Sequence, residues 1–141
     1  MLDRRSLTVA LHWLNLLLLI LLVAAGPVPA LAWVFVASAF MMTGLALLRG
    51  LLNGPGPKLT GFLRSAHPVL SWAMYLGLAA VAALTALALL GQWTAPASLR
   101  EIYFYTLGAA SLHAVFHLWR HTALGDGALR RITPKPLHDM L

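Results

Sequence analysis

Cysteine is absent from this chain of 141 residues, and charged side chains make up only 10% of it. Without cysteine, disulfide bonds, thiolate chemistry and Cys-ligated iron or zinc sites are excluded. Acidic residues are the scarcest charged type, with four in all, and they lie near or outside the ends of the apolar runs. No Ser-His-Asp or Cys-His set, the usual basis of nucleophilic catalysis, is therefore visible.

Hydrophobic residues, in contrast, make up 60% of the chain. A soluble domain carries about 25% charged residues, and a chain this short cannot bury so much apolar surface in one small core. A lipid bilayer removes that conflict. The net charge of +6 does not indicate a nucleic-acid partner, because the basic residues lie in short loops between apolar runs.

Four apolar runs, each about 18 to 22 residues long, match the length of a helix that crosses the hydrocarbon layer. They are residues 7–25, 30–48, 69–90 and 102–119. Leu and Ala dominate them without the alternating polarity of barrel strands. Because the loops are short, consecutive helices should pack antiparallel. We therefore expect an all-α fold, a single transmembrane four-helix bundle over residues 1–141 with up-down topology.

Basic residues give the expected orientation. Of the ten Lys and Arg residues, all but Arg100 lie at the N-terminus, between the second and third runs, or after the fourth run. Short loops rich in Lys and Arg stay in the cytoplasm. Both termini are therefore expected on the cytoplasmic side.

The N-terminal segment also has features of a signal peptide. Arg4 and Arg5 precede an apolar run that ends in Ala-Gly-Pro-Val-Pro-Ala-Leu-Ala, a pattern that resembles a cleavage site. A histidine inside the run, His12, suits a functional helix better. We expect this segment to form the first transmembrane helix.

Histidines carry the chemistry that the sequence offers. His12 lies roughly 9 Å above the inner end of the first run, and His113 roughly 10 Å above the inner end of the fourth. Polar side chains in a membrane segment are costly and usually face the bundle interior. Two imidazoles at matched depth on two helices have the geometry of a six-coordinate haem, with one axial nitrogen from each. A single membrane histidine, however, can also simply hydrogen-bond a neighbouring helix.

The fourth run offers more than one candidate ligand. His113, His117 and His121 recur at intervals of four residues and form one stripe. His113 matches the depth of His12 best, His117 is the alternative, and His121 is expected near the lipid headgroups. Zinc would need three or four clustered ligands, which one stripe without a carboxylate does not offer.

Several other residues are candidates for contacts with a cofactor. His67, at the expected start of the third helix and followed by Pro68, suits a hydrogen bond to a haem propionate or a quinone oxygen, or else an interfacial anchor. Arg5, Arg64 and Arg120 could pair with propionates. For each arginine, the positive-inside rule alone is an alternative explanation.

Three segments of this sequence resemble a known family. They are residues 7–13, which end in Leu-His-Trp; residues 49–52, which precede several prolines; and residues 112–134, in which a histidine is followed by a short Asp-containing stretch, Leu-Arg and Pro. All three resemble the bacterial cytochrome b561 family. That resemblance covers most of the chain in hydropathy but is specific only in the first and fourth helices.

The resemblance implies a bundle in the bacterial inner membrane that binds b-type haem and exchanges electrons with the quinone pool. It implies that His12 and His113 are the axial ligands of the haem nearer the cytoplasm. Members usually hold a second haem near the outer face, ligated from the second and fourth helices. Phe35 stands roughly where the first of those ligands is expected, and residues 99–103 also lack histidine. We therefore expect one haem b, and an outer half packed with Ala, Leu and Phe.

The expected function is membrane electron transfer between quinone and a redox protein partner, either alone or as a subunit of a larger respiratory complex. Two alternatives remain open. One is a haem-free structural or assembly subunit that keeps the family scaffold. The other is a quinone-reducing oxidoreductase in its own right.

Overall fold

The computed structural model describes residues 3–92 and 97–140, and within these ranges it is helical, with no strand. The four long helices are α1 (Arg4–Ala25), α2 (Pro29–Arg49), α3 (Gly61–Leu89) and α4 (Leu99–Thr122). Two short 3-10 helices, η1 (Leu129–Arg131) and η2 (Lys135–Met140), follow α4. The prediction of an all-α fold is confirmed.

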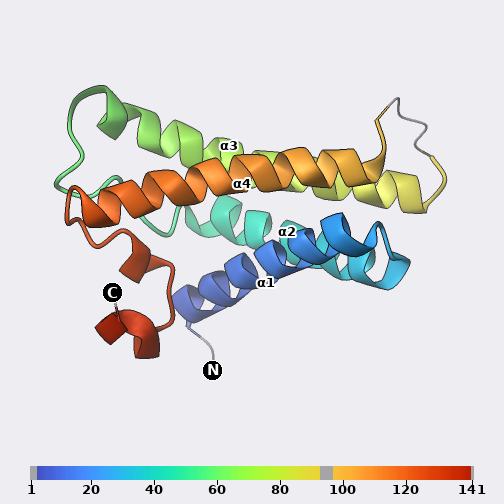
Figure 1. The fold of residues 1–141 in the computed structure, drawn as a ribbon, viewed down its shortest axis with the longest axis horizontal. Helices are drawn as coiled ribbons and strands as arrows, with labels where there is room; N and C mark the ends of the chain where they lie inside the picture. Colours follow the sequence, from blue (N-terminus) through green and yellow to red (C-terminus); the bar gives the residue numbers. More distant parts are fainter. Residues whose placement is uncertain (1–2, 93–96, 141) are drawn as a thin grey trace.

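The long helices lie side by side, and successive helices run in opposite directions (Figure 1). α1 packs against α2 and α4, and α3 packs against α2 and α4. As a result, the start of α1, the end of α4 and the tail with η1 and η2 lie at one end of the molecule (Figure 1). We call this the basic end, and the opposite end, where α1 ends and α4 begins, the distal end.

Local sequence signals explain where the helices begin. The Asp3 carboxylate caps α1 by accepting a hydrogen bond from the Ser6 amide, at 2.6 Å. Ser98 and Glu101 form a capping box at the start of α4, in which each side chain accepts from the other residue's backbone amide. Such caps satisfy amides that have no partner within the helix.

The start of α3 differs from the prediction. The helix begins at Gly61, after Thr60, and not near residue 69, so Pro68 lies inside it and not at its start. Proline lacks an amide proton, and one hydrogen bond of the helix is lost there. The apolar run is shorter than this helix because the first turns of the helix contain Arg64 and His67. These two residues lower the local hydropathy without preventing helix formation.

Among the described helices, α1, α2 and α3 are long and apolar enough to cross a membrane. Their side chains agree with that, since large apolar residues such as Leu47, Leu48 and Val69 are strongly exposed. α4 matches the expected fourth run in position, but His113 and His117 make it less apolar than the other three helices. A lipid bilayer is therefore the environment that the surface of this protein fits.

The apolar core lies toward the distal end. It is formed by side chains of α1, α2, α3 and α4, namely Leu18, Leu19, Leu22, Ala32, Phe35, Val36, Ala39, Ala82 and Tyr103. At its centre the rings of Phe35 and Tyr103 meet edge to face, 5.9 Å apart, and the Tyr103 hydroxyl lies 3.0 Å from that of Thr85. The core at the distal end thus consists mainly of Leu and Ala side chains around the Phe35 and Tyr103 rings.

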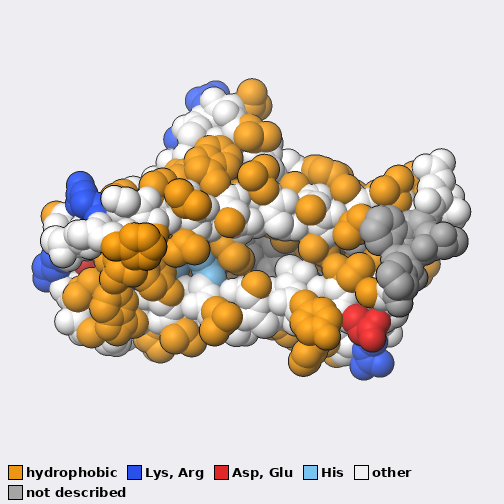
Figure 2. All heavy atoms as spheres, turned by 90° about the horizontal axis from the view of Figure 1, so that it is seen from above, with side chains coloured by type: hydrophobic (Ala, Val, Ile, Leu, Met, Phe, Trp, Pro, Cys, Tyr) orange, Lys and Arg blue, Asp and Glu red, His pale blue; other side chains and the backbone are white. Residues whose placement is uncertain are grey.

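The basic end is held together by arginine and lysine side chains that donate to backbone carbonyl groups. Arg4 donates to Gly50, and Lys58 donates to Gly125. Arg131 donates to Gly54 and to Asp126. Figure 2 shows Lys and Arg side chains at one end of the molecule and on a projecting part of its surface, and a single basic group beside an acidic one at the other end.

Candidate functional site

The two histidines predicted as a pair lie within electrostatic range of each other. His12 comes from α1 and His113 from α4, the two helices that pack against each other. They are near enough to interact electrostatically, and both are half-buried. Figure 2 shows histidine atoms at the floor of a hollow that is bordered by hydrophobic side chains.

Two further histidines extend the group toward α3. The ring of His117 lies 4.5 Å from that of His113, one turn earlier on α4, and 6.2 Å from that of His67 on α3. His12, His113, His117 and His67 therefore form a row that leads from α1 along α4 to α3. We call these four residues the histidine row. None of them belongs to the apolar core, which lies toward the distal end.

Some imidazole nitrogens of the histidine row lack partners. The Nδ1 atoms of His67 and His117 are buried, and each has no hydrogen-bond partner in the described part of the chain. His67 itself is only 3% exposed. A buried polar atom without a partner costs about 1 to 3 kcal/mol. Both rings thus keep a buried nitrogen available for a ligand.

A buried ion pair lies beside the histidine row, at the basic end of the molecule. Arg120 is 1% exposed, and its Nε atom donates to the Asp126 carboxylate at 2.8 Å, while its Nη2 atom donates to the same oxygen and to the Pro55 carbonyl. Arg120 and Asp126 are near enough to His67 and His117 to interact with them electrostatically. The guanidinium is also 5.9 Å from the centre of the Phe116 ring.

The three arginines predicted near propionates all lie at the basic end, and all have partners within the chain. Arg5 donates to the carbonyls of Arg130 and Thr133 in the tail. Arg64 donates to the carbonyls of Gly56 and Leu59 ahead of α3. Of the three, the structure brings only Arg120 next to the histidine row.

Gly56 is the point at which the loop between α2 and α3 meets these guanidinium groups. Its φ of +78° lies in the left-handed region, and a Cβ atom there would lie 2.8 Å from an Nη atom of Arg131 and 3.2 Å from one of Arg120. Only glycine fits such an approach without strain. The loop backbone is thereby drawn against the arginines that border the histidine row.

The distal half has buried aromatic rings where the other half has the histidine row. Phe35 and Tyr103 occupy the two regions in which the family resemblance would place ligands of an outer haem, and both are fully buried. Their rings are in edge-to-face contact. The space between α2 and α4 at this depth is filled by protein side chains.

Two polar features of the interior were missed in the sequence. Asp126 is one of the four acidic residues of the chain, and it is the partner of the buried Arg120. An acidic residue in a mostly basic segment was the available signal. The other is a small network in which Ser38 donates to Asn15 at 2.9 Å and Asn15 donates to the Leu11 carbonyl. An asparagine in an apolar run was the signal for that network.

No group of three or more histidine or acidic side chains arranged to hold a metal ion is found in residues 3–92 and 97–140. A haem differs from such a centre because it takes only two axial ligands from the protein. In comparisons with protein-family models, with curated proteins and with solved structures, none matches this chain.

Proposed function

We propose that this protein is a membrane electron-transfer cytochrome that holds one b-type haem between His12 of α1 and His113 of α4. The observation that carries the proposal is the histidine row, in which these two imidazoles lie within electrostatic range of each other in a polar half of an otherwise apolar protein. The resemblance of the first and fourth helices to the bacterial cytochrome b561 family points to the same pair.

The residues present fit a haem in three respects. The candidate ligands come from two helices that pack against each other, so each helix would supply one nitrogen to hold a haem. The half of the molecule that contains them lacks the apolar core, and Figure 2 shows a hollow with histidine atoms at its floor. Finally, the unpartnered nitrogen of His117 provides an alternative ligand from α4, one turn closer to the basic end.

In this proposal a bound haem would supply a one-electron redox couple, and the chain would determine its position and its surroundings. His12 and His113 fix its position, and the apolar side chains around them exclude water. The guanidinium groups of the basic end attract its carboxylates. Leu112 and Val115 leave an apolar face of α4 exposed next to His113, which suits exchange of electrons with a quinone that diffuses in the bilayer. A redox protein or a larger respiratory complex would be the other partner.

We further propose that all four helices cross the bilayer as an up-down bundle, with both termini in the cytoplasm of a bacterial inner membrane. The basic end supports this orientation, since all but one of the ten Lys and Arg residues belong to the segments at that end. The exception, Arg100, donates to the Val23 carbonyl at the distal end. Positive charge on one side is the main determinant of orientation in membrane proteins.

The test is an absorbance spectrum of the purified full-length protein, oxidised and then reduced with dithionite, together with a haem assay. The expected result is one haem per chain with the sharp reduced bands of bis-His ligation. His12→Ala and His113→Ala should each remove this spectrum. His138→Ala is the matched control, because His138 lies in η2 and bonds the Thr133 carbonyl in the tail.

Each other outcome has a defined meaning. Loss of the spectrum in His117→Ala but not in His113→Ala would move the α4 ligand by one turn. A protein that contains no haem and takes up none when haem is added would contradict the proposal and favour a structural subunit. Steady turnover of a quinone by the isolated chain would instead favour an oxidoreductase.

A further inference from the structure

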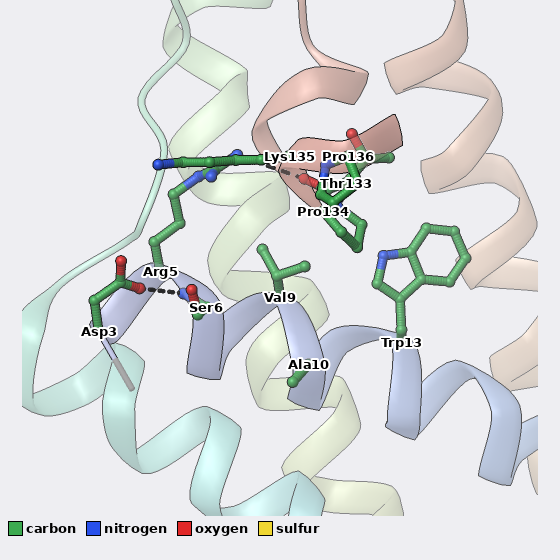
Figure 3. Close-up of a pocket in the computed structure, with 10 residues that line it drawn as sticks. All are labelled: Asp3, Arg5, Ser6, Val9, Ala10, Trp13, Thr133, Pro134, Lys135 and Pro136. Carbon is green, nitrogen blue, oxygen red and sulfur yellow. Dashed lines mark hydrogen bonds between the residues drawn. The ribbon is translucent and has the colours of Figure 1, made fainter. Parts of the chain in front are cut away.

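A cavity of about 440 Å³ lies at the basic end between α1 and the tail, and the histidine row is not among its lining residues. Its floor is the first three turns of α1, and its roof is residues 133–136 of the tail (Figure 3). The cavity is thus formed by the two extremes of the described chain. We call it the tail groove.

The tail groove has a cationic side. Arg5 extends from α1 toward the tail, and Lys135 lies on the tail near it (Figure 3). Both are close enough to Asp3 to interact with its carboxylate. Asp3 is committed to the helix cap, where it accepts the Ser6 amide proton. The groove therefore keeps a net positive charge that favours an anion.

The opposite side of the groove is apolar and continues onto the surface of α1. Val9, Ala10 and Trp13 line it, and Trp13 remains 44% exposed. Trp13 also donates from its indole nitrogen to the Ile132 carbonyl, at 2.9 Å, which holds the ring beneath the tail (Figure 3). Because α1 is apolar enough to cross a membrane, this side leads from the groove into the region of the acyl chains.

We propose that the tail groove binds the headgroup of an anionic phospholipid, with its phosphate near Arg5 and Lys135 and an acyl chain along Val9, Ala10 and Trp13. A ligand that is anionic at one end and apolar at the other matches both sides of the groove. A free phosphate ion would use only the cationic side. Clusters of basic residues beside a membrane helix attract anionic lipids in general, and a tryptophan at this level is typical of the interface.

The bound headgroup would also fix the tail. Arg5 donates to the carbonyls of Arg130 and Thr133, and Trp13 donates to that of Ile132. The same side chains thus form the groove and hold its roof in place. A lipid that contacts both Arg5 and Lys135 links α1 to the tail by a second route, independent of whether the protein carries haem.

The experiment measures the affinity of the full-length protein for phosphatidylglycerol and for phosphatidylcholine, in neutral detergent micelles. The readout is quenching of tryptophan fluorescence by brominated acyl chains, with Trp13→Phe used to assign the signal of Trp13. The expected result is a preference for phosphatidylglycerol. Lys135→Gln should lower that preference about fivefold, the effect of one basic residue near an anionic surface, and Lys135→Arg should retain it. Arg5→Gln should lower it similarly, but this variant also loosens the tail.

Arg49→Gln is the matched control, because it removes the same charge from the end of α2, outside the groove. An equal loss in Arg49→Gln and Lys135→Gln would overturn the proposal, since it would mean that the whole basic end attracts the lipid. Quenching that persists unchanged in Trp13→Phe would also overturn it. If inorganic phosphate competes as strongly as a short-chain phosphatidylglycerol, the site is one for free phosphate, and the assignment to a lipid is wrong.

Discussion

Replacing Asp126 by asparagine should destabilise the protein more than any loss of charge on its surface. Arg120 and Asp126 are the buried ion pair of the basic end, with side-chain exposures of 1% and 0%. Asp126→Asn keeps the size of the side chain and an oxygen able to accept from the Ala128 amide, as Asp126 does at 2.8 Å. What it removes is the negative charge that faces the Arg120 guanidinium.

The magnitude follows from the burial of the pair. Breaking a buried ion pair by removing one partner costs about 3 to 5 kcal/mol, because the remaining charge stays buried without compensation. Arg120 would keep its hydrogen bond to the Pro55 carbonyl, which places the expected cost near the lower limit of about 3 kcal/mol. That corresponds to a change of about a hundredfold in the unfolding equilibrium. An exposed pair would contribute only about 0 to 1 kcal/mol.

The measurement is equilibrium unfolding of the full-length protein in mixed micelles, with amide hydrogen exchange to locate the effect. Exchange should rise first in residues 54–56 and 125–128, which Arg120 and Asp126 join. The double variant Arg120→Met with Asp126→Asn should recover part of the stability, since it removes the buried charge as well. A loss below about 1 kcal/mol in Asp126→Asn would refute the account, because that is the range of an exposed pair.

Two further substitutions test other parts of the structure. Gly56→Ala should destabilise the protein by about 1 to 3 kcal/mol, because φ is positive there and the new Cβ would meet the guanidinium of Arg131. The measurement is thermal unfolding. The control is Gly44→Ala, which should not lower the midpoint because Gly44 faces open space on α2. Tyr103→Phe should lower the free energy of unfolding by about 1 kcal/mol, because the contact with the Thr85 hydroxyl is lost. Phe35→Ala should lower it by about 3 to 5 kcal/mol, because the substitution leaves a cavity. Equal effects of these two substitutions in the same unfolding assay would contradict the packing assigned to the distal core.

Much of the fold could be predicted because hydropathy and turn residues are local signals. The ends of α1 and α2 lie within a few residues of the predicted runs, and the prolines and glycines between helices mark where they end. The start of α3 was missed because a hydropathy run records where a helix becomes apolar, not where its hydrogen bonding begins. Residues 61–68 are helical, but they include Arg64 and His67 and therefore fall outside the apolar run.

The site was predictable only in part, for a related reason. Depth along a helix can be counted from the sequence, so His12 and His113 could be matched. The approach of His67 to His117 depends on how α3 and α4 face each other, and nothing in either segment encodes that rotation locally. The pairing of Arg120 with Asp126 crosses the end of a helix and depends on the turn between them.

The contrast between the two halves of the molecule is the strongest physical reason to assign it a ligand. At the distal end the described part of the chain fills its interior with Leu, Ala, Phe and Tyr, and the buried Tyr103 hydroxyl has a partner in Thr85. At the basic end the same helices place four histidines, and two of these keep a buried nitrogen without a partner. Leucine at those positions would avoid a cost of about 1 to 3 kcal/mol for each such atom. A chain that can pack an apolar core in one half has no structural need of imidazoles in the other, so their presence is best explained by a group that they bind.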